Sequence, residues 1–295
     1  MRRIAERRPE AMGDATERFS ARRRRLVWAA VLVGAVAVGG AALAAGGGPR
    51  DDGQRIIDLS RFFEGYDGCF VLLDLTSGEF QRFNPARCDE RLSPCSTFKI
   101  PHALIGLETG VLKDEHATFR WDGSPQPIKS WQGDHTLASA IKHSVLWYFQ
   151  RVAAGIGPKR MQTFVDRMDY GNRNIRGGIT TFWLDRDALK ISANEQAAFL
   201  AKLYRDELPF QPQHMETVRR LLVLDDDDGT VFSGKTGSSR PDASGRSLGW
   251  FIGHVKTGER KHVFATIIRG IKDASGRHAR WITKEILRDL KLMDE

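Results

Sequence analysis

The sequence predicts an α+β fold, in which an antiparallel β-sheet is flanked by helices and an all-helical lobe is inserted between its strands. Three observations predict it: strand patterns near both ends of the folded part, helical patterns between them, and an ordinary globular composition. The chain has 295 residues, of which 41% are hydrophobic and 28% charged, which is typical of a soluble protein. This length allows one large domain or two lobes with a cleft between them.

The strands of the predicted sheet come from two separate parts of the chain. Residues 70–74 indicate a buried strand, and residues 79–83 alternate in polarity after a Ser-Gly turn, which favours a hairpin. Three further strands are expected at residues 230–232, 249–255 and 262–268. We therefore assign a sheet lobe to about residues 55–95 and 229–295.

Helical patterns fill the middle of the chain. Apolar residues recur at three- to four-residue spacing at residues 100–109, 137–154, 158–168 and 193–204. An amphipathic helix is also expected near the end, at residues 281–292. The four middle segments define the inserted helical lobe, at about residues 96–228.

The first 48 residues have the composition of a targeting segment. Four arginines at residues 22–25 precede an uncharged run at residues 26–48, and such a basic flank stays on the cytoplasmic side. The run approaches the length of a membrane anchor, but a Gly-Gly pair interrupts it and Ala-Leu-Ala at 42–44 fits a cleavage site. Residues 1–48 are interpreted as a signal peptide or N-terminal membrane anchor. Residues 49–295 are then an exported domain, periplasmic after cleavage or anchored in the inner membrane facing the periplasm.

The formal net charge of +8 is concentrated in that segment. Residues 1–49 contain nine basic and four acidic residues, so the remainder has a net charge of only about +3. We therefore expect no nucleic-acid partner. We also expect no metal, because the eight histidines form no ligand pair and residues 225–228, taken as an acidic turn, lack the spaced ligands of a calcium loop.

The strongest local signal is Ser-Thr-Phe-Lys at residues 96–99, which opens a predicted helix. Residues three apart share a helix face, so the amine of Lys99 comes within reach of the hydroxyl of Ser96. A serine hydroxyl needs a neighbouring base to become a good nucleophile. Lysine can be that base only if its pKa falls well below about 10.4 or if it is chemically modified. Taken alone, the pattern is also common in ordinary helix starts.

Further motifs follow in a fixed order. Ser144 begins Ser-Val-Leu, Tyr170 begins Tyr-Gly-Asn, and Lys235 begins Lys-Thr-Gly on a predicted strand. The order S-x-x-K, S-x-V, Y-G-N, K-T-G is that of the penicillin-recognising serine enzymes. Longer strings at residues 93–110, 147–150, 182–185 and 249–253 closely resemble class D β-lactamases, the oxacillinase type. The resemblance covers roughly residues 55–292 and implies the penicillin-binding fold.

The resemblance implies a catalytic role for four residues besides Lys235. Ser96 would attack the carbonyl of a β-lactam and become acylated. Lys99 would bear a carbamate formed from carbon dioxide or bicarbonate and act as the base for acylation and deacylation, and no other cofactor is implied. The indole N–H of Trp183 would hold the carbamate, and Ser144 would pass a proton to the leaving nitrogen. Tyr170 and its two neighbours are interpreted as mainly structural.

The same resemblance implies a set of substrate-binding residues. Lys235 and Thr236, with Gly237 beside them, would hold the substrate carboxylate. An arginine on the last helix would assist, and Arg280 is favoured over Arg277 because Ala-Arg-Trp-Ile-Thr-Lys resembles the ending of the family.

Two details concern the backbone and a departure from the family pattern. Backbone N–H groups of Ser96 and Ser238 would form the oxyanion hole. Leu146 stands where the family usually has valine, which leaves the mechanism intact but alters the access of water near the lysine.

Three cysteines allow one disulfide and one free thiol in an oxidising compartment. Cys88 and Cys95 lie seven apart in a loop that ends beside Ser96, and we favour this pair. The alternative is that Cys69, Cys88 and Cys95 are three unpaired core residues.

Three other functions share some of these motifs. Residues 229–236 match the Walker A pattern literally, but aspartates precede them and turn residues rather than a helix follow, so no nucleotide is expected. A β-lactam sensor ectodomain and a penicillin-binding transpeptidase or carboxypeptidase would also be acylated at Ser96. The Trp183 segment and the spacing of S-x-V favour the β-lactamase. The motifs indicate neither the preferred β-lactam nor the oligomeric state.

Overall fold

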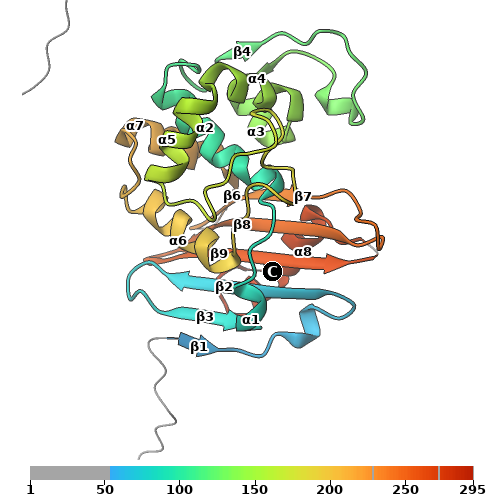
Figure 1. Ribbon diagram of the computed structural model, residues 1–295. Helices are drawn as coiled ribbons and strands as arrows, with labels where there is room; N and C mark the ends of the chain where they lie inside the picture. Colours follow the sequence, from blue (N-terminus) through green and yellow to red (C-terminus); the bar gives the residue numbers. More distant parts are fainter. Residues whose placement is uncertain (1–53, 228, 272, 295) are drawn as a thin grey trace, which may run out of the picture. The chain divides into compact units, whose positions relative to one another are not determined.

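The computed structural model describes residues 54–227, 229–271 and 273–294, and a seven-stranded sheet forms its base (Figure 1). The order across the sheet is β1-β3-β2-β9-β8-β7-β6. The strands are β1 (Gln54–Ile56), β2 (Asp67–Asp74), β3 (Phe80–Phe83), β6 (Val223–Asp227), β7 (Thr230–Ser238), β8 (Ser247–Thr257) and β9 (Arg260–Gly270). Neighbouring strands are antiparallel except β1 and β3. Residues 67–74 pair with residues 262–269, so strands from the two ends of the folded part lie side by side.

Both faces of the sheet are covered, which explains the apolar character of its central strands. Eight consecutive residues of β8 are buried. Helix α8 (Gly276–Asp289) covers one face, where Phe232, Phe251 and Phe264 form the core. Helix α6 (Ala193–Tyr204) covers the other face over β2 and β9, in front of the sheet in Figure 1. A strand buried on both faces has no polar side, so period-two alternation is lost.

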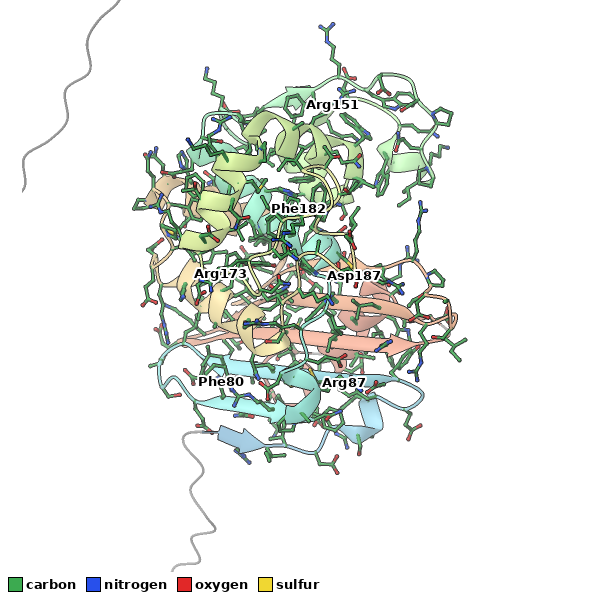
Figure 2. The ribbon with its side chains drawn as sticks, viewed as in Figure 1. Phe80, Arg87, Arg151, Arg173, Phe182 and Asp187 are labelled. Carbon is green, nitrogen blue, oxygen red and sulfur yellow. The ribbon has the colours of Figure 1, made fainter. Side chains whose placement is uncertain are left out.

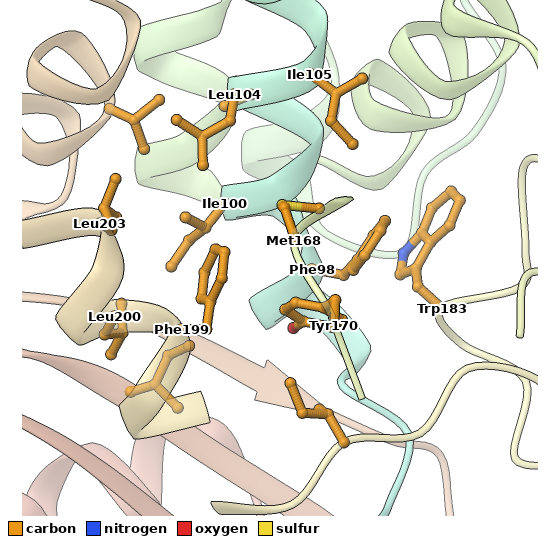
Figure 3. Close-up of a cluster of buried hydrophobic side chains, with 14 of the residues drawn as sticks. Phe98, Ile100, Leu104, Ile105, Met168, Tyr170, Trp183, Phe199, Leu200 and Leu203 are labelled. Atoms are coloured by element: carbon orange, nitrogen blue, oxygen red, sulfur yellow. The ribbon is translucent and has the colours of Figure 1, made fainter. Parts of the chain in front are cut away.

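The helical lobe is built around α2 (Lys99–Glu108). Every residue from Lys99 to Leu107 is buried, as expected for a helix surrounded by other elements. Figure 3 shows Ile100 and Leu104 of α2 on the side of that helix that faces Leu200 and Leu203 of α6. The other helices of the lobe are α3 (Leu137–His143), α4 (Leu146–Ile156), α5 (Pro158–Arg167) and α7 (Pro212–Leu221).

The predicted fold class is confirmed, and the structure refines it in four places. The helix expected at residues 137–154 is two helices, α3 and α4, which Ser144 and Val145 separate. The lobe also contains a small sheet of β4 (Thr118–Phe119) and β5 (His135–Thr136). The acidic run expected to be a turn lies mostly in β6, because pairing with β7 overrides its low strand propensity. Helix α8 begins at Gly276, not at residue 281.

The predicted Cys88–Cys95 disulfide is wrong, because all three cysteines are free and buried. Cys88 closes the short helix α1 (Pro85–Cys88), and its thiol donates to the carbonyl of Phe83 at 3.3 Å. The thiol of Cys95 faces Ser93 Oγ at 3.8 Å instead. Burial raises the pKa of Cys95 to about 11, so this thiol is an unreactive core group. The alternative of three unpaired core cysteines describes the structure.

The predicted signal peptide or anchor at residues 1–48 lies outside the described residues. Within the described ranges, no helix is long and apolar enough to span a bilayer. The same ranges contain no cluster of three or more histidine, cysteine or acidic side chains able to bind a metal.

Candidate active site

The loop before Ser96 is fixed by hydrogen bonds to two distant segments. Cys95, with a positive φ of 51°, donates its backbone N–H to the carbonyl of Trp183 at 3.0 Å. The hydroxyl of Ser93 donates to the same carbonyl at 2.9 Å, and Trp250 Nε1 donates to the carbonyl of Ser93 at 3.0 Å. A short 3-10 helix, η2 (Cys95–Phe98), then leads directly into α2. Ser96 is thereby held on a rigid turn.

Ser96, Lys99, Ser144 and Lys235 form one hydrogen-bonded chain. Lys99 Nζ lies 3.0 Å from Ser96 Oγ and 2.9 Å from Ser144 Oγ, and it donates to the Ser144 carbonyl at 2.5 Å. Lys235 Nζ donates to Ser144 Oγ at 2.9 Å and to the carbonyl of Thr236 at 3.0 Å. Four predicted catalytic residues from the helical lobe and from β7 are therefore in direct contact.

Ser144 reaches this position because it interrupts a helix. It caps the C-terminus of α3 in the left-handed conformation, with φ 54° and ψ 43°, and α4 starts two residues later. Left-handed backbone costs a non-glycine residue roughly 1–2 kcal/mol. In this left-handed conformation, both the carbonyl and the hydroxyl of Ser144 contact Lys99. Strain of this kind is concentrated at functional sites.

Burial changes the protonation of both lysines. The side chain of Lys99 is inaccessible to solvent, and its burial, with a smaller contribution from the charge of Lys235, holds its pKa well below the usual value. Desolvation also lowers the pKa of Lys235 to about 7. A charged ammonium loses its hydration in such surroundings, which favours the neutral amine. Lys99 is therefore suited to accept a proton as a base, because its neutral amine is favoured over the ammonium cation.

A cavity of about 1070 Å³ opens in front of this chain. Ser96 and Ser144 line it, whereas Lys99 and Lys235 lie behind them. Thr236, Gly237 and Ser238 line it from β7, and Arg277 and Arg280 line it from α8. The lining residues are Ser96, Ile128, Ser130, Trp131, Lys142, His143, Ser144, Thr236, Gly237, Ser238, Asp273, Ser275, Arg277, His278, Arg280 and Trp281.

Some of these side chains were not anticipated. Trp131 lines the cavity, and its Nε1 donates to the carbonyl of His143 at 3.0 Å. Lys142 at the end of α3 and Trp281 on α8, which is 54% exposed, also line it. A short 3-10 segment, η3 (Lys129–Trp131), brings Trp131 there.

The wall formed by β7 lies very close to the loop that bears Ser96. A Cβ at Gly237 would come within 3.0 Å of the Pro94 carbonyl and 3.2 Å of Thr97 Cγ2. A Cβ at Gly276, the first residue of α8, would come within 2.7 Å of the Gly237 carbonyl. The hydroxyl of Ser238 accepts the backbone N–H of Gly276 at 2.9 Å. Glycines thus allow three segments to converge on Ser96.

Two predicted site residues lie outside the cavity. Leu146 is half-buried and packs against the core rather than lining the cavity. Trp183 is fully buried, and its Nε1 has no hydrogen-bond partner among the described residues. Its sequence neighbour Phe182 lies in the interior between the helices and the sheet in Figure 2. Tyr170 is structural, since its hydroxyl donates to Gln196 at 3.3 Å within the core.

Residues 229–236, which match the Walker A pattern, form no phosphate-binding loop. They run straight into β7, which continues to Ser238 and pairs along its length with β8. A P-loop would have to end at a helix N-terminus.

Comparison with known proteins agrees with this geometry. Residues 34–288 match the penicillin binding protein transpeptidase domain family. The chain is 41% identical over 231 residues to the probable β-lactamase YbxI of Bacillus subtilis, covering 78% of this chain and 84% of that protein. It is similar to the crystal structure of a class D β-lactamase from Bacillus subtilis, with a TM-score of 0.76 and 40% identity over 81% of this chain and 98% of the other. The chain belongs to the class D β-lactamase family.

A second structural likeness concerns a receptor rather than a β-lactamase. The C-terminal domain of the Bacillus licheniformis BlaR penicillin-receptor has a TM-score of 0.78 and 34% identity, covering 82% of this chain and 98% of that one. Class D enzymes and this receptor domain therefore share one scaffold with the present chain. The scaffold alone therefore does not distinguish an enzyme that turns over β-lactams from a receptor that stays acylated, and this difference depends on the chemistry of the site.

Proposed function

We propose that this class D family member hydrolyses β-lactams through an acyl-Ser96 intermediate, with Lys99 in carbamylated form as the general base. The observation that supports it most directly is the 3.0 Å contact between Ser96 Oγ and a fully buried lysine amine. A serine hydroxyl with a neutral base at hydrogen-bond distance is an activated nucleophile. The hydroxyl faces a cavity large enough for a bicyclic antibiotic.

The surroundings of Lys99 fit a carbamate. The amine must be neutral to react with carbon dioxide, and burial lowers its pKa in the required direction. Phe149 and Trp131 place their ring centroids 5.7 and 5.9 Å from Nζ, so the surroundings are largely apolar. The buried indole N–H of Trp183 has no acceptor among the described residues, and an anionic oxygen would supply one. When present, the carbamate supplies a carboxylate-like base for acylation and for the deacylating water.

Ser144 and Lys235 are the proposed route for the proton to the leaving nitrogen. Ser144 Oγ lies 2.9 Å from both lysine amines, so its hydroxyl can donate to a substrate while Lys235 replaces the proton. A pKa of about 7 allows Lys235 to be protonated or neutral near physiological pH. Its position between Ser144 and Thr236 allows one residue to assist both chemistry and binding.

The cavity wall is proposed to bind the carboxylate that β-lactams carry. Thr236 lines the cavity, and Lys142, Arg277 and Arg280 add positive charge around it, opposed among the lining residues only by Asp273. We assign the carboxylate contact to Thr236 and Arg280, supported by Lys235 from behind. Backbone N–H groups of Ser96 and Ser238 are the proposed oxyanion hole, on the two segments that Gly237 brings together.

Export is part of the proposal. β-Lactams that attack cell-wall synthesis act outside the cytoplasm, and the basic and apolar composition of residues 1–48 is that of an export segment. We propose a location in the periplasm, or on the outer face of the inner membrane if the segment is retained.

The decisive experiment is steady-state hydrolysis of a chromogenic cephalosporin and of oxacillin by the purified protein, with and without bicarbonate. Sustained turnover that rises with bicarbonate and disappears in Ser96→Ala is the expected result. A single stoichiometric burst that ends in a stable acyl-protein would favour the receptor-like function. An absence of acylation would contradict the proposal altogether.

A further inference from the structure

His102 is a buried histidine with no assigned task. It lies on α2, three residues after Lys99, and its side chain is inaccessible to solvent. Neither Nδ1 nor Nε2 has a hydrogen-bond partner among the described residues. A leucine would fill a similar volume without burying two polar nitrogens, so simple packing does not explain a histidine at this place.

The ring of His102 lies against Trp183 in a box of aromatic side chains. The two ring centroids are 4.4 Å apart at an angle of 83°, and Phe98 approaches His102 edge-on at 4.6 Å. Phe149 stacks beside His102 at 6.0 Å, and the same ring lies 5.7 Å from Lys99 Nζ. Figure 3 shows Trp183 beside α2 with its indole nitrogen on the side of the ring that faces Phe98.

Three unpaired buried polar atoms therefore occur in two side chains that touch each other, Trp183 Nε1 and the two nitrogens of His102. Burial, assisted by the nearby charge of Lys99, lowers the pKa of His102 well below its usual value, so the ring is neutral and has one N–H donor. Trp183 and His102 thus offer two N–H donors that have no acceptor among the described residues, and a bound anionic group would supply one.

We propose that His102 is a positioning residue for the carbamate of Lys99, to which its ring N–H donates alongside the indole N–H of Trp183. This inference rests on the carbamylation in the proposed function. The neutral Nζ adds to the carbon of carbon dioxide, an N–C bond forms, one C=O electron pair moves to oxygen, and the amine proton leaves to water.

A neutral donor suits this task better than a cation. A protonated histidine beside Lys99 would repel the ammonium form and require solvation that the aromatic box lacks. A neutral imidazole lets Lys99 lose its charge first and then stabilises the anion that replaces it. His102 thereby sets the affinity for carbon dioxide without taking part in proton transfer.

The experiment is ¹³C NMR of the full-length protein titrated with ¹³C-bicarbonate, together with thermal unfolding at each concentration. His102→Leu removes the donor, and His102→Asn keeps one. His254→Leu is the matched control, because His254 is also buried with an unpaired nitrogen but stacks on Tyr204, outside the aromatic box.

His102→Leu is expected to need roughly tenfold more bicarbonate for half-maximal carbamate signal, the effect of one hydrogen bond to a charged group. The rise in Tm that bicarbonate produces should shrink with it. His102→Asn should recover part of the affinity, and His254→Leu should titrate like the unmodified chain.

The outcomes separate the two proposals. If the unmodified chain gives a carbamate signal and both His102 variants need the same bicarbonate concentration as that chain, the role of His102 is overturned and carbamylation is not. No carbamate signal in the unmodified chain at saturating bicarbonate would overturn carbamylation and with it this inference. If His102→Leu fails to fold, the titration of His102→Asn decides, since a half-maximal bicarbonate concentration equal to that of the unmodified chain would contradict a role for the His102 donor.

Discussion

Replacing Ser144 with glycine should separate catalysis from stability. The residue adopts a left-handed backbone, φ 54°, that costs an L-residue roughly 1–2 kcal/mol and costs glycine almost nothing. The substitution also deletes an oxygen that accepts hydrogen bonds from Lys99 and Lys235, each worth about 1 kcal/mol net. Both lysines keep other partners, Ser96 Oγ for one and the Thr236 carbonyl for the other. The gain and the loss nearly cancel, so Tm should stay within roughly 4 °C of the unmodified value.

Acylation should respond very differently to the same change. If Ser144 transfers the proton to the leaving nitrogen, its loss should lower kcat/KM by about 10²- to 10⁴-fold, the range for a positioned acid or base. Stopped-flow hydrolysis of a chromogenic cephalosporin measures kcat/KM, and intact-protein mass measures the rate at which acyl-Ser96 forms.

The control is Arg173→Gly, which relieves a similar backbone strain at an exposed position, φ 57°, on the surface in Figure 2. It should leave kcat/KM unchanged. A kcat/KM within about threefold of normal in Ser144→Gly would refute the proton route through Ser144, whatever the Tm.

Two further predictions concern β7. The pKa of Lys235 is about 7, so its ammonium exists below that pH and is lost above it; kcat/KM for carboxylate-bearing substrates should therefore fall as pH rises through about 7. In Lys235→Arg, whose guanidinium stays charged, the alkaline fall should vanish, and an identical pH profile in both proteins would exclude a role for the ammonium. Gly237→Ala would force a Cβ to within 3.0 Å of the Pro94 carbonyl and 3.3 Å of Trp250 Cβ. It should destabilise the protein by about 1–3 kcal/mol and slow acylation, and chemical denaturation showing no loss would mean that the strand can move freely.

The sequence predicted those parts of the fold in which local pattern and tertiary contact agree. The core strands β2, β8 and β9 and helix α6 were expected at residues 70–74, 249–255, 262–268 and 193–204, and each contains or matches its predicted range. Ser96 and Lys99 could be paired in advance because the spacing of three residues on a helix is set by backbone geometry alone. Their distance of 3.0 Å follows that rule.

Features that depend on distant contacts could not be predicted. The apolar periodicity continues through Ser144, so the sequence shows no break there. The break between α3 and α4 comes from the left-handed backbone of Ser144, whose carbonyl accepts a hydrogen bond from Lys99. The aspartates of β6 have low strand propensity, and only pairing with β7 makes them a strand. Arg277 and Arg280 both line the cavity, because α8 begins at Gly276, so the preference for Arg280 continues to rest on the family resemblance of its segment.

Pairing of β2 with β9 has a consequence for biosynthesis. The partners are roughly 190–200 positions apart along the chain, which makes the contact order of the sheet high and its closure slow. Until residues 260–270 have been made, β2 lacks one of its neighbours. A chain that is still being synthesised therefore has an unpaired strand edge along β2. An unpaired edge favours aggregation, so chaperones that shield the β2 edge would raise the yield of folded protein.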